Sequence, residues 1–297
     1  MEMVKKEPKL QKIRKVSLFK IILYSLMAIF ALITLYPFWY VLIGSFNEGV
    51  DYMNGGIWIW PREVTLYNYI VALDDERLLI GFKNTALRTV FNTFISLSFT
   101  SLVAYAMSNK NLKLKGFFYK ANLFTMFFGG GLIPTFMIIV KLGFYNSFLV
   151  YIIPSMYSVY NMIVLSSFFR EIPEELRESA FLDGAGEWTI FTKIYLPLSK
   201  PVLATVGLWL IVGNWNSYQA TLIYTSDSGL MTLQYYLMLL IKQSSSVEID
   251  DPLLLEKVNS TTLTYASIVI ATIPVLIVYP FLSKYFSKGI MLGAVKG

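Results

Sequence analysis

A short acidic segment is the first part of this 297-residue sequence whose side chains could do chemistry. Its five carboxylates are Glu171, Glu174, Glu175, Glu178 and Asp183. The chain has no Cys and no His, so these acids have no thiolate, imidazole base or soft metal ligand beside them. Most nucleophilic, zinc and disulfide chemistry is thereby excluded. We therefore interpret the segment as a surface that recognises another molecule, and we expect no catalytic residue and no metal site.

The composition around this segment is that of a membrane protein. Apolar residues make up 56% of the chain, charged residues 15%, and the mean hydropathy is +0.57. Such a chain exposes too little polarity to face water on all sides. The net charge of +6 suits anionic lipid or nucleic acid, and only the placement of the charges can decide between them.

Six segments are long and apolar enough to cross a membrane, which takes about 20 residues for roughly 30 Å of hydrocarbon. We predict spans at residues 17–46, 85–107, 117–140, 147–169, 201–224 and 263–286. The first is too long for a signal peptide and lacks a small-residue cleavage site, so we expect it to stay as an anchor. The sequence thus predicts an all-α domain with six transmembrane helices over residues 17–286, with tails at 1–16 and 287–297.

Lys and Arg indicate which side each loop faces, because basic residues are retained in the cytoplasm. They gather in the N-terminal tail, the loop after the second span, the loop 170–200 after the fourth, and the C-terminal tail. Fewer lie in the alternate loops, which include the long external segments 47–84 and 225–262. Both termini and the acidic segment are therefore predicted to be cytoplasmic. The basic N-terminus is interpreted as a topology signal, and no nucleic acid is expected as a partner.

The loop 170–200 is predicted to form two short helices joined by an elbow. Pro173 followed by two acids marks the first helix start, since Pro suits the first helical position and acids favour the positive end of the helix dipole. Gly184 permits the left-handed backbone that ends this helix. The second helix is expected to begin near Gly186 and to break at Leu196–Pro197.

The first elbow helix is amphipathic. Leu176, Ala180 and Phe181 share one face, and Arg177 and Glu178 are expected to turn away from it. An amphipathic linker lying among lipid headgroups is one interpretation. The helix is acidic, however, which is the wrong sign for anionic lipid. An exposed helix with an apolar stripe suits a groove on another protein, and we favour that interpretation.

The run ESAFLDGAGEWTIFTKIYLP, residues 178–197, resembles the cytoplasmic signature of permease subunits of binding-protein-dependent (type I) ABC importers. The pattern is a Glu-Ala-Ala start, a Gly four residues after the second Ala, and an Ile-x-Leu-Pro close; Ser179 replaces the first Ala. The flanking IPEELRESAFLDGAG and LPLSKP are similar to the carbohydrate branch, including the maltose-importer permeases. FFGGGLIPTFMIIVKLGFYNSFLVYIIP resembles permeases for complex or plant-derived oligosaccharides. The resemblance covers all six predicted spans and the ending KGIMLGAVKG.

This resemblance implies a transport subunit in the bacterial cell membrane, driven by two separate ATP-binding subunits that hold ATP and Mg. A second homologous permease and an external solute-binding protein would complete the importer. The chain has no Gly-x-x-x-x-Gly-Lys-Ser/Thr pattern of its own, so it is expected to carry no ATPase site and no cofactor. The residues implied in coupling to an ATPase subunit are Leu176, Glu178, Ser179, Ala180, Phe181, Asp183 and Gly184. The tail residues Lys296 and Gly297 resemble permease tails that insert near the ATPase, with a frayed terminus as the alternative.

The cargo is expected to be a neutral polar solute, with carbohydrate as the leading class. No ionisable side chain is expected in the middle of a span, where a charge costs roughly 2.5–3.5 kcal/mol on insertion scales, so ion-coupled transport has little support. Aromatic residues make up 16% of the chain, and Tyr and Trp faces stack on sugar rings. Membrane-interface belts and packing are the alternative use of these aromatics.

Polar residues in the fifth span form the candidate translocation pathway. The stretch GNWNSYQAT would be expensive to point at lipid, so it should face either a pore or a neighbouring helix. The candidate residues are Asn214, Trp215, Asn216, Tyr218 and Gln219. In the third span a Gly run and Pro134 interrupt the helix, and Gly130 joins the candidate pathway, with close helix packing as the alternative.

The external segment 225–262 contains LMTLQYYLMLLIKQ, which predicts an amphipathic helix too short to span the membrane. If the family resemblance holds, this segment is the candidate contact for the solute-binding protein; a plain surface loop is the alternative.

The function predicted from the sequence is that of the permease subunit of an ATP-driven oligosaccharide importer, forming half of the translocation pathway. An ABC permease for a peptide or an amino acid is the nearest alternative. A self-sufficient secondary transporter or channel would need buried charges or a selectivity ring. A membrane-embedded enzyme would need carboxylates or a Ser/Lys pair at depth, and the sequence offers neither set.

Overall fold

A computed structural model describes the chain over residues 18–243 and 258–293. Every regular element in these ranges is helical, and a single β-bridge pairs Asn47 with Val64. The elements are α1 (Leu18–Ser45), α2 (Gly49–Met53), α3 (Tyr67–Asp74), α4 (Glu76–Ser108), α5 (Lys115–Phe127), α6 (Leu132–Lys141), η1 (Phe148–Tyr151), η2 (Ile153–Ser155), α7 (Val159–Phe169), α8 (Glu174–Leu182), α9 (Glu187–Ile190), η3 (Phe191–Tyr195), α10 (Leu196–Leu198), α11 (Lys200–Asn216), α12 (Gln219–Tyr224), η4 (Ser228–Leu230), α13 (Leu233–Gln243) and α15 (Ser260–Gly293). The all-α expectation is confirmed for the described residues.

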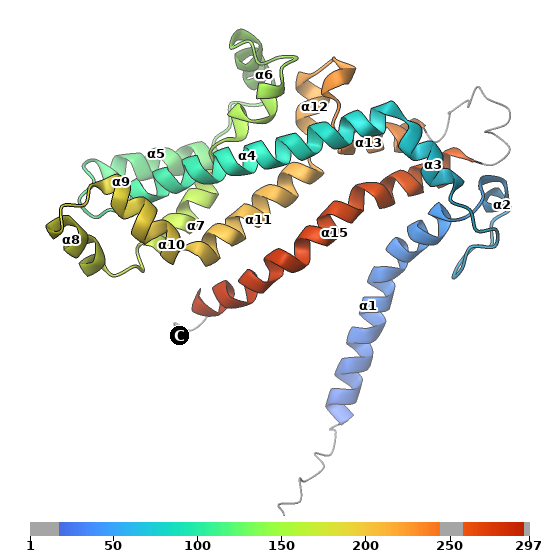
Figure 1. Ribbon diagram of the computed structural model, residues 1–297, viewed down its shortest axis with the longest axis horizontal. Helices are drawn as coiled ribbons and strands as arrows, with labels where there is room; N and C mark the ends of the chain where they lie inside the picture. The colour runs from blue at the N-terminus through green and yellow to red at the C-terminus, as the bar shows by residue number, and fades with distance from the viewer. Residues whose placement is uncertain (1–17, 244–257, 294–297) are drawn as a thin grey trace, which may run out of the picture.

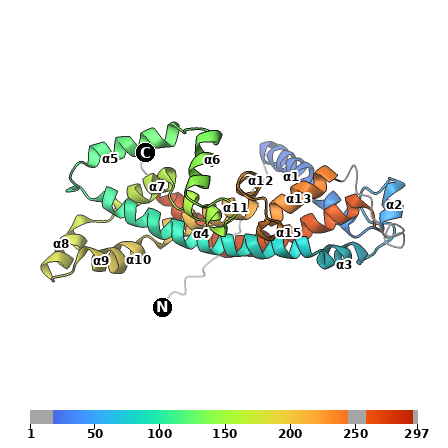
Figure 2. The ribbon, with the colours of Figure 1, turned by 90° about the horizontal axis from the view of Figure 1, so that it is seen from above.

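The long helix α4 is the axis of the molecule (Figure 1). Its 33 residues extend over about 50 Å at 1.5 Å per residue. Helices α7, α11 and α15 lie along it, α8 to α10 gather at one end, and α2, α3 and α13 lie toward the other, as the second view also shows (Figure 2). The two groups of loop helices are thus held at opposite ends of one rigid element.

Two apolar cores lie along α4, one toward each end. The first packs Leu78, Trp215, Leu233 and Tyr236 against Ala266 of α15. The second lies beside α8 to α10 and is built from Ala104, Met107, Met162, Leu165, Phe169, Ile190, Phe191, Tyr195, Val202 and Val206. Because α4 contributes to both cores, neither end can repack without involving it.

Three described helices are long and apolar enough to cross a membrane: α1, α4 and the Ser260–Val278 part of α15. They coincide with the first, second and sixth predicted spans. Three bent helix pairs also qualify by length and composition, which gives up to six crossings if each pair counts as one. The first two pairs correspond to the third and fourth predicted spans. The last pair joins residues 187–198 of the elbow to α11, and only α11 falls in the fifth predicted span, 201–224, which is interrupted between α11 and α12.

The third predicted span is sharply broken. Helices α5 and α6 meet at 111° across the Gly129–Gly131 run. Gly131 has φ +90°, a backbone region that side-chain-bearing residues rarely adopt, and Pro134 lies in the first turn of α6. The interruption predicted from these residues is confirmed.

The fourth predicted span, 147–169, is α-helical only over Val159–Phe169. Residues 148–155 form two 3₁₀ turns bent by 48° from α7. This departs from the apolar pattern, which indicated a continuous helix. The turns leave the carbonyls of Tyr151 and Ile152 free, and the buried Asn92 of α4 takes both as hydrogen-bond acceptors. Irregular backbone inside a membrane protein persists when another element satisfies it in this way.

The elbow follows the predicted plan with one correction. Helix α8 begins after Pro173 and ends before Gly184, whose φ of +80° is the left-handed exit expected there. The second helix does not break at Leu196–Pro197; after α9 it passes through the π-helical segment η3 and continues through α10 to Leu198. The sharp turn of 82° comes at Ser199 instead.

Helix α1 stands apart from the rest of the chain (Figure 1). Residues 18–39 are exposed, and only Ile43, Gly44 and Ser45 of this helix are buried. Where it meets the body of the protein, Gly44 lies against the ring of Tyr265 of α15. An apolar helix of 28 residues left uncovered by its own chain must be covered by lipid or by another subunit.

Candidate functional site

Arg177 is the central residue of the elbow. Its side chain is only 12% exposed, although α8 is a short surface helix. Nη2 donates to Glu187 Oε1 at 2.6 Å, and the guanidinium carbon lies 5.0 Å from the centre of the Phe181 ring. The expectation that Arg177 turns away from the apolar face is therefore wrong. The spacing within one helix could not show that Glu187, on the next helix, would draw it inward.

The elbow is fixed to the end of α4 at two points. Tyr105 of α4 donates its hydroxyl to Glu187 Oε2, and its ring lies 5.2 Å from Phe191 and 4.8 Å from Tyr195, centre to centre. Just beyond α4, Lys110 Nζ lies 2.6 Å from Glu174 Oε2. The hydrogen bond and charge of Lys110 lower the pKa of Glu174, and Glu174 in turn raises the pKa of Lys110.

Most of the predicted coupling residues are exposed on α8. Leu176 and Phe181 are 44% and 43% exposed, and Leu182 next to them is 89% exposed. Glu178, Ser179, Asp183 and Gly184 are exposed as well. Ala180 differs, because it is half-buried and packs against the core beside α7 and α9. Helix α8 therefore exposes apolar and acidic side chains together on its outer surface.

Trp188 extends this surface and was not among the predicted coupling residues. Its side chain is 66% exposed, and its ring lies 5.8 Å from that of Phe191. A signal for it was present, because a Trp directly after the Gly184–Gly186 turn is costly to leave in water.

The candidate pathway residues divide into two groups. Asn214 is buried and donates to Asn92 Oδ1 of α4 at 2.9 Å. Trp215 is also buried and donates Nε1–H to the Ala271 carbonyl of α15 at 3.0 Å. These two side chains join helices within the chain. The others, Asn216, Tyr218 and Gln219, are exposed around the break between α11 and α12, and Gly130 is exposed in the break between α5 and α6.

Arg88 is a buried charge near the start of the second predicted span, residues 85–107. It does not lie in the middle of the span, the region in which no ionisable side chain was expected. The residue is 5% exposed, Nη1 donates to the Ser217 carbonyl at 2.9 Å, and the guanidinium lies 5.2 Å from the centre of the Tyr151 ring. The α11–α12 break leaves the Ser217 carbonyl available to accept from this guanidinium, which compensates for its burial. An Arg stays charged at any working pH, so it is not a proton carrier.

A polar stripe along α4 was missed by sequence reasoning. Every fourth residue is small or polar and buried: Asn84, Arg88, Asn92, Ser96, Thr100, Ala104 and Ser108. Residues four apart lie on the same side of a helix, so this spacing was a visible signal. Asn92 is the best connected, since Nδ2 donates to Tyr151 O at 2.9 Å and Ser155 Oγ at 2.6 Å while Oδ1 accepts from Asn214.

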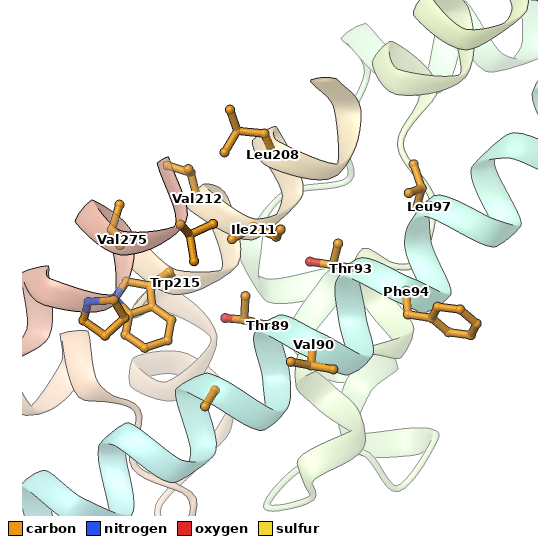
Figure 3. A pocket seen from close by; sticks show the side chains of 13 residues that line it. Thr89, Val90, Thr93, Phe94, Leu97, Leu208, Ile211, Val212, Trp215 and Val275 are labelled. Carbon is orange, nitrogen blue, oxygen red and sulfur yellow. The ribbon is translucent and has the colours of Figure 1, made fainter. Parts of the chain in front are cut away.

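A cleft of about 480 Å³ opens between α4, α11 and α15. Figure 3 shows the side chains of Thr89 and Thr93 pointing from α4 toward α11, and neither hydroxyl has a hydrogen-bond partner. The remaining lining is apolar: Ala86, Val90, Phe94, Leu97, Leu208, Ile211, Val212, Trp215, Pro274, Val275 and Val278. A sugar needs partners for many hydroxyls, so this cleft does not suit one.

The external segment is held firmly to the opposite end of α4 from the elbow. Asn84 Nδ2 donates to the carbonyls of Gly229 and Met231, both at 2.8 Å, and Thr85 Oγ1 accepts from the Leu233 amide at 2.9 Å. The predicted amphipathic helix is present as α13, with Leu233 fully buried. The polar run 244–251 that follows it, and the tail residues Lys296 and Gly297, lie outside the described residues.

Tyr236 adds a second contact at this end, because its hydroxyl donates to Asp75 Oδ2 at 2.8 Å. Asp75 caps α4 through the Arg77 amide, at 2.8 Å, and pairs with the Arg77 side chain. Burial works to raise the pKa of Asp75, but the hydrogen bonds from Arg77 and Tyr236 together outweigh it and lower the pKa.

Known proteins share both the sequence and the shape of this chain. The polygalacturonan/rhamnogalacturonan transport system permease protein YtcP of Bacillus subtilis (strain 168) is 37% identical over 94% of this chain and 99% of its own length. The melibiose/raffinose/stachyose import permease protein MelC of the same organism is 29% identical over 93% and 96%.

Among solved structures, a chain of a bacterial ABC transporter involved in the import of the acidic polysaccharide alginate superposes with a TM-score of 0.87. It is 32% identical, and the match covers 90% of this chain and 96% of that one. A chain from an alginate transporter in complex with a pentasaccharide-bound periplasmic protein shares the fold, with a TM-score of 0.58 at 14% identity over 89% of this chain and 93% of that one.

The sequence pattern that defines binding-protein-dependent transport system inner membrane components matches residues 12–292, nearly the whole chain. With the helical permease fold and the elbow signature in place, the chain belongs to this family of ABC importer permeases.

Proposed function

We propose that this permease subunit moves oligosaccharides across the bacterial cell membrane as half of the translocation pathway of an ATP-driven importer. The observation that carries the proposal is the superposition on the alginate importer chain, which extends over 96% of that chain at 32% identity. The named relatives support it, because polygalacturonan, rhamnogalacturonan, melibiose and raffinose are all glycans.

Six crossings with both termini in the cytoplasm are part of this proposal. The three straight helices, the bent pairs α5–α6 and 148–169, and α11 with α12 would supply the crossings. The distribution of Lys and Arg over alternate loops supports the orientation, with the elbow at residues 170–200 inside and the segments 47–84 and 225–262 outside. In this orientation α4 extends from the external segment that carries α13 to the cytoplasmic elbow.

The outer surface of α8 is the proposed contact with an ATPase subunit, which would bind ATP and Mg. Leu176 and Phe181 would enter an apolar cleft, and the neighbouring Glu178 would meet a basic group. The exposed apolar length of α1 supports a second, similar permease as a further partner, since lipid alone does not account for a helix that projects away from its own bundle.

Acidic glycans are the cargo class that we would test first. Two named matches above 30% identity, the polygalacturonan/rhamnogalacturonan permease and the alginate importer chain, handle polymers that contain uronic acids. The exposed Asn216, Tyr218 and Gln219 offer amide and phenol groups suited to sugar hydroxyls and carboxylates. A solute-binding protein would deliver the cargo beside α13.

The test is ATP-dependent uptake into proteoliposomes that contain the chain, its partner permease, its ATPase and its solute-binding protein. We expect uptake of labelled oligogalacturonate, and no uptake of a tripeptide. Glu178→Lys and Gly184→Pro should abolish uptake and binding-protein-stimulated ATP hydrolysis while the chain still inserts. Lys193→Gln removes an exposed charge from the second elbow helix and should leave both activities unchanged. Uptake by the chain alone, without an ATPase, would overturn the proposal.

A further inference from the structure

Helix α8 is held in place by charges more than by apolar packing. None of its nine residues is fully buried. A polar hollow of about 260 Å³ lies between it and the end of α4, lined in part by Tyr105, Lys110, Glu174 and Arg177. A helix over a hollow has few apolar contacts to fix its angle, so directional hydrogen bonds must supply the geometry.

Arg177 supplies most of that geometry. It pairs with Glu187 of α9 at 2.6 Å, lies 3.9 Å from Glu174 one turn earlier in α8, and stacks on Phe181. The second oxygen of Glu187 accepts from Tyr105 of α4. One guanidinium thus links both elbow helices, and through Glu187 it reaches the long helix.

The Lys110–Glu174 and Arg177–Glu187 ion pairs of the elbow differ in how firmly they can hold α8. The Lys110–Glu174 pair is short, but the Lys110 side chain is 77% exposed, and exposed pairs contribute little. The Arg177 side chain is 12% exposed, and its Nε has no partner, so removing Glu187 would leave a largely buried charge with only the more distant carboxylate of Glu174, at 3.9 Å. The Arg177–Glu187 pair is therefore the one that sets the position of α8.

We propose that Arg177 is a positioning residue of the importer, which locks α8 to α9 and to the end of α4 so that a displacement of α8 reaches the membrane helices. This inference rests on the proposed docking of α8 to the ATPase. It assigns to Arg177 a role in transmission and leaves recognition of the ATPase to the outer surface of α8. Loss of the lock should leave the ATPase bound but poorly controlled.

The experiment uses the complete importer in nanodiscs and compares ATP hydrolysis with and without the solute-binding protein loaded with oligogalacturonate. The Arg177→Gln importer should retain its ATPase subunit on purification. The ratio of ATP hydrolysis with the loaded binding protein to hydrolysis without it should fall at least about fivefold, the lower end of typical coupling between two sites. Glu187→Gln should give the same loss. The double variant should lose no more than either single one, because the two residues act as one unit.

Three results would overturn the inference. Wild-type stimulation in Arg177→Gln would show that the pair transmits nothing. Loss of the ATPase from the purified complex would place Arg177 in recognition or in folding. Additive losses in the double variant would show that Arg177 and Glu187 act separately. Lys193→Gln, a neutralised cation on the same elbow, is the matched control. Glu178→Lys tests the docking proposal separately. If this variant leaves the ATPase bound and stimulated, the proposed docking of α8 fails, whatever the result for Arg177.

Discussion

Replacement of Asn92 by Ala removes more hydrogen bonds than any other single change that the buried stripe of α4 offers. The side chain is 1% exposed, donates to Tyr151 O and Ser155 Oγ, and accepts from Asn214. Ala would remove the bonds to the Tyr151 carbonyl, to the Ser155 hydroxyl and from the Asn214 amide. At about 1 kcal/mol for each of these three bonds, a low value chosen because an unfolded membrane chain also finds partners, we expect a loss of about 3 kcal/mol.

Asn214→Ala removes only the shared bond, so it should cost about 1 kcal/mol. With roughly 2–4 °C per kcal/mol for a chain of this size, the apparent unfolding midpoint should fall by about 6–12 °C for Asn92→Ala and by about 2–4 °C for Asn214→Ala. Thermal unfolding in detergent, followed by Trp fluorescence, measures both. Asn216→Ala is the matched control, because its exposed amide donates to Val212 in the preceding turn and accepts only a long bond, 3.4 Å, from Gln234.

The double variant should cost less than the sum of the single ones, since both remove the same Asn92–Asn214 bond. Equal shifts for the two single variants would refute the reasoning. So would full additivity, because either result means that Asn92 does not join α4 to the 3₁₀ turns and to α11 at once.

Two further predictions concern the ends of α4 and the elbow. Gly184→Ala places a side chain on a backbone with φ +80° and should lower the free energy of unfolding by about 1–2 kcal/mol. Gly186→Ala is the control, because Gly186 has φ −76° and open space around it, so its free energy of unfolding should not fall. The unfolding midpoints of the two variants test this difference. Asp75 has a lowered pKa in the folded chain, so its contribution should be fully present above the ordinary value of 3.8 and be lost as pH falls below it. The midpoint difference between wild type and Asp75→Asn, recorded from neutral to acidic pH, should shrink only in that range, and a difference that grows toward low pH would contradict the assignment.

Features set by local chemistry were predictable from the sequence. Pro173 and Gly184 define the two ends of α8 by their own backbone preferences. The length and apolar composition of α1, α4 and α15 identify these helices as candidate membrane spans. The break between α5 and α6 follows from its Gly run for the same reason. The family was also predictable from the sequence, because its signature motif lies within 20 consecutive residues, 178–197.

Features set by contacts between distant segments were not predictable in this way. The 3₁₀ turns before α7 depend on Asn92, 59 residues earlier than Tyr151, which no local pattern connects to them. Arg177 turns inward because Glu187 receives it, and Arg88 is buried because the chain breaks at Ser217. The roles of the exposed residues on α8 and around the α11–α12 break stay predictions until transport is measured.

The four-residue spacing along α4 has a geometric consequence. A helix turns by about 100° per residue, so each step of four residues overshoots a full circle by about 40°. From Asn84 to Ser108 the stripe therefore winds by about 240° around the helix axis. Asn84 faces the segment before α13, Asn92 faces α11, and the far end faces the elbow. We expect that α4 cannot roll about its axis alone, because any rotation would pull hydrogen bonds on several sides at once and would carry the neighbouring helices with it.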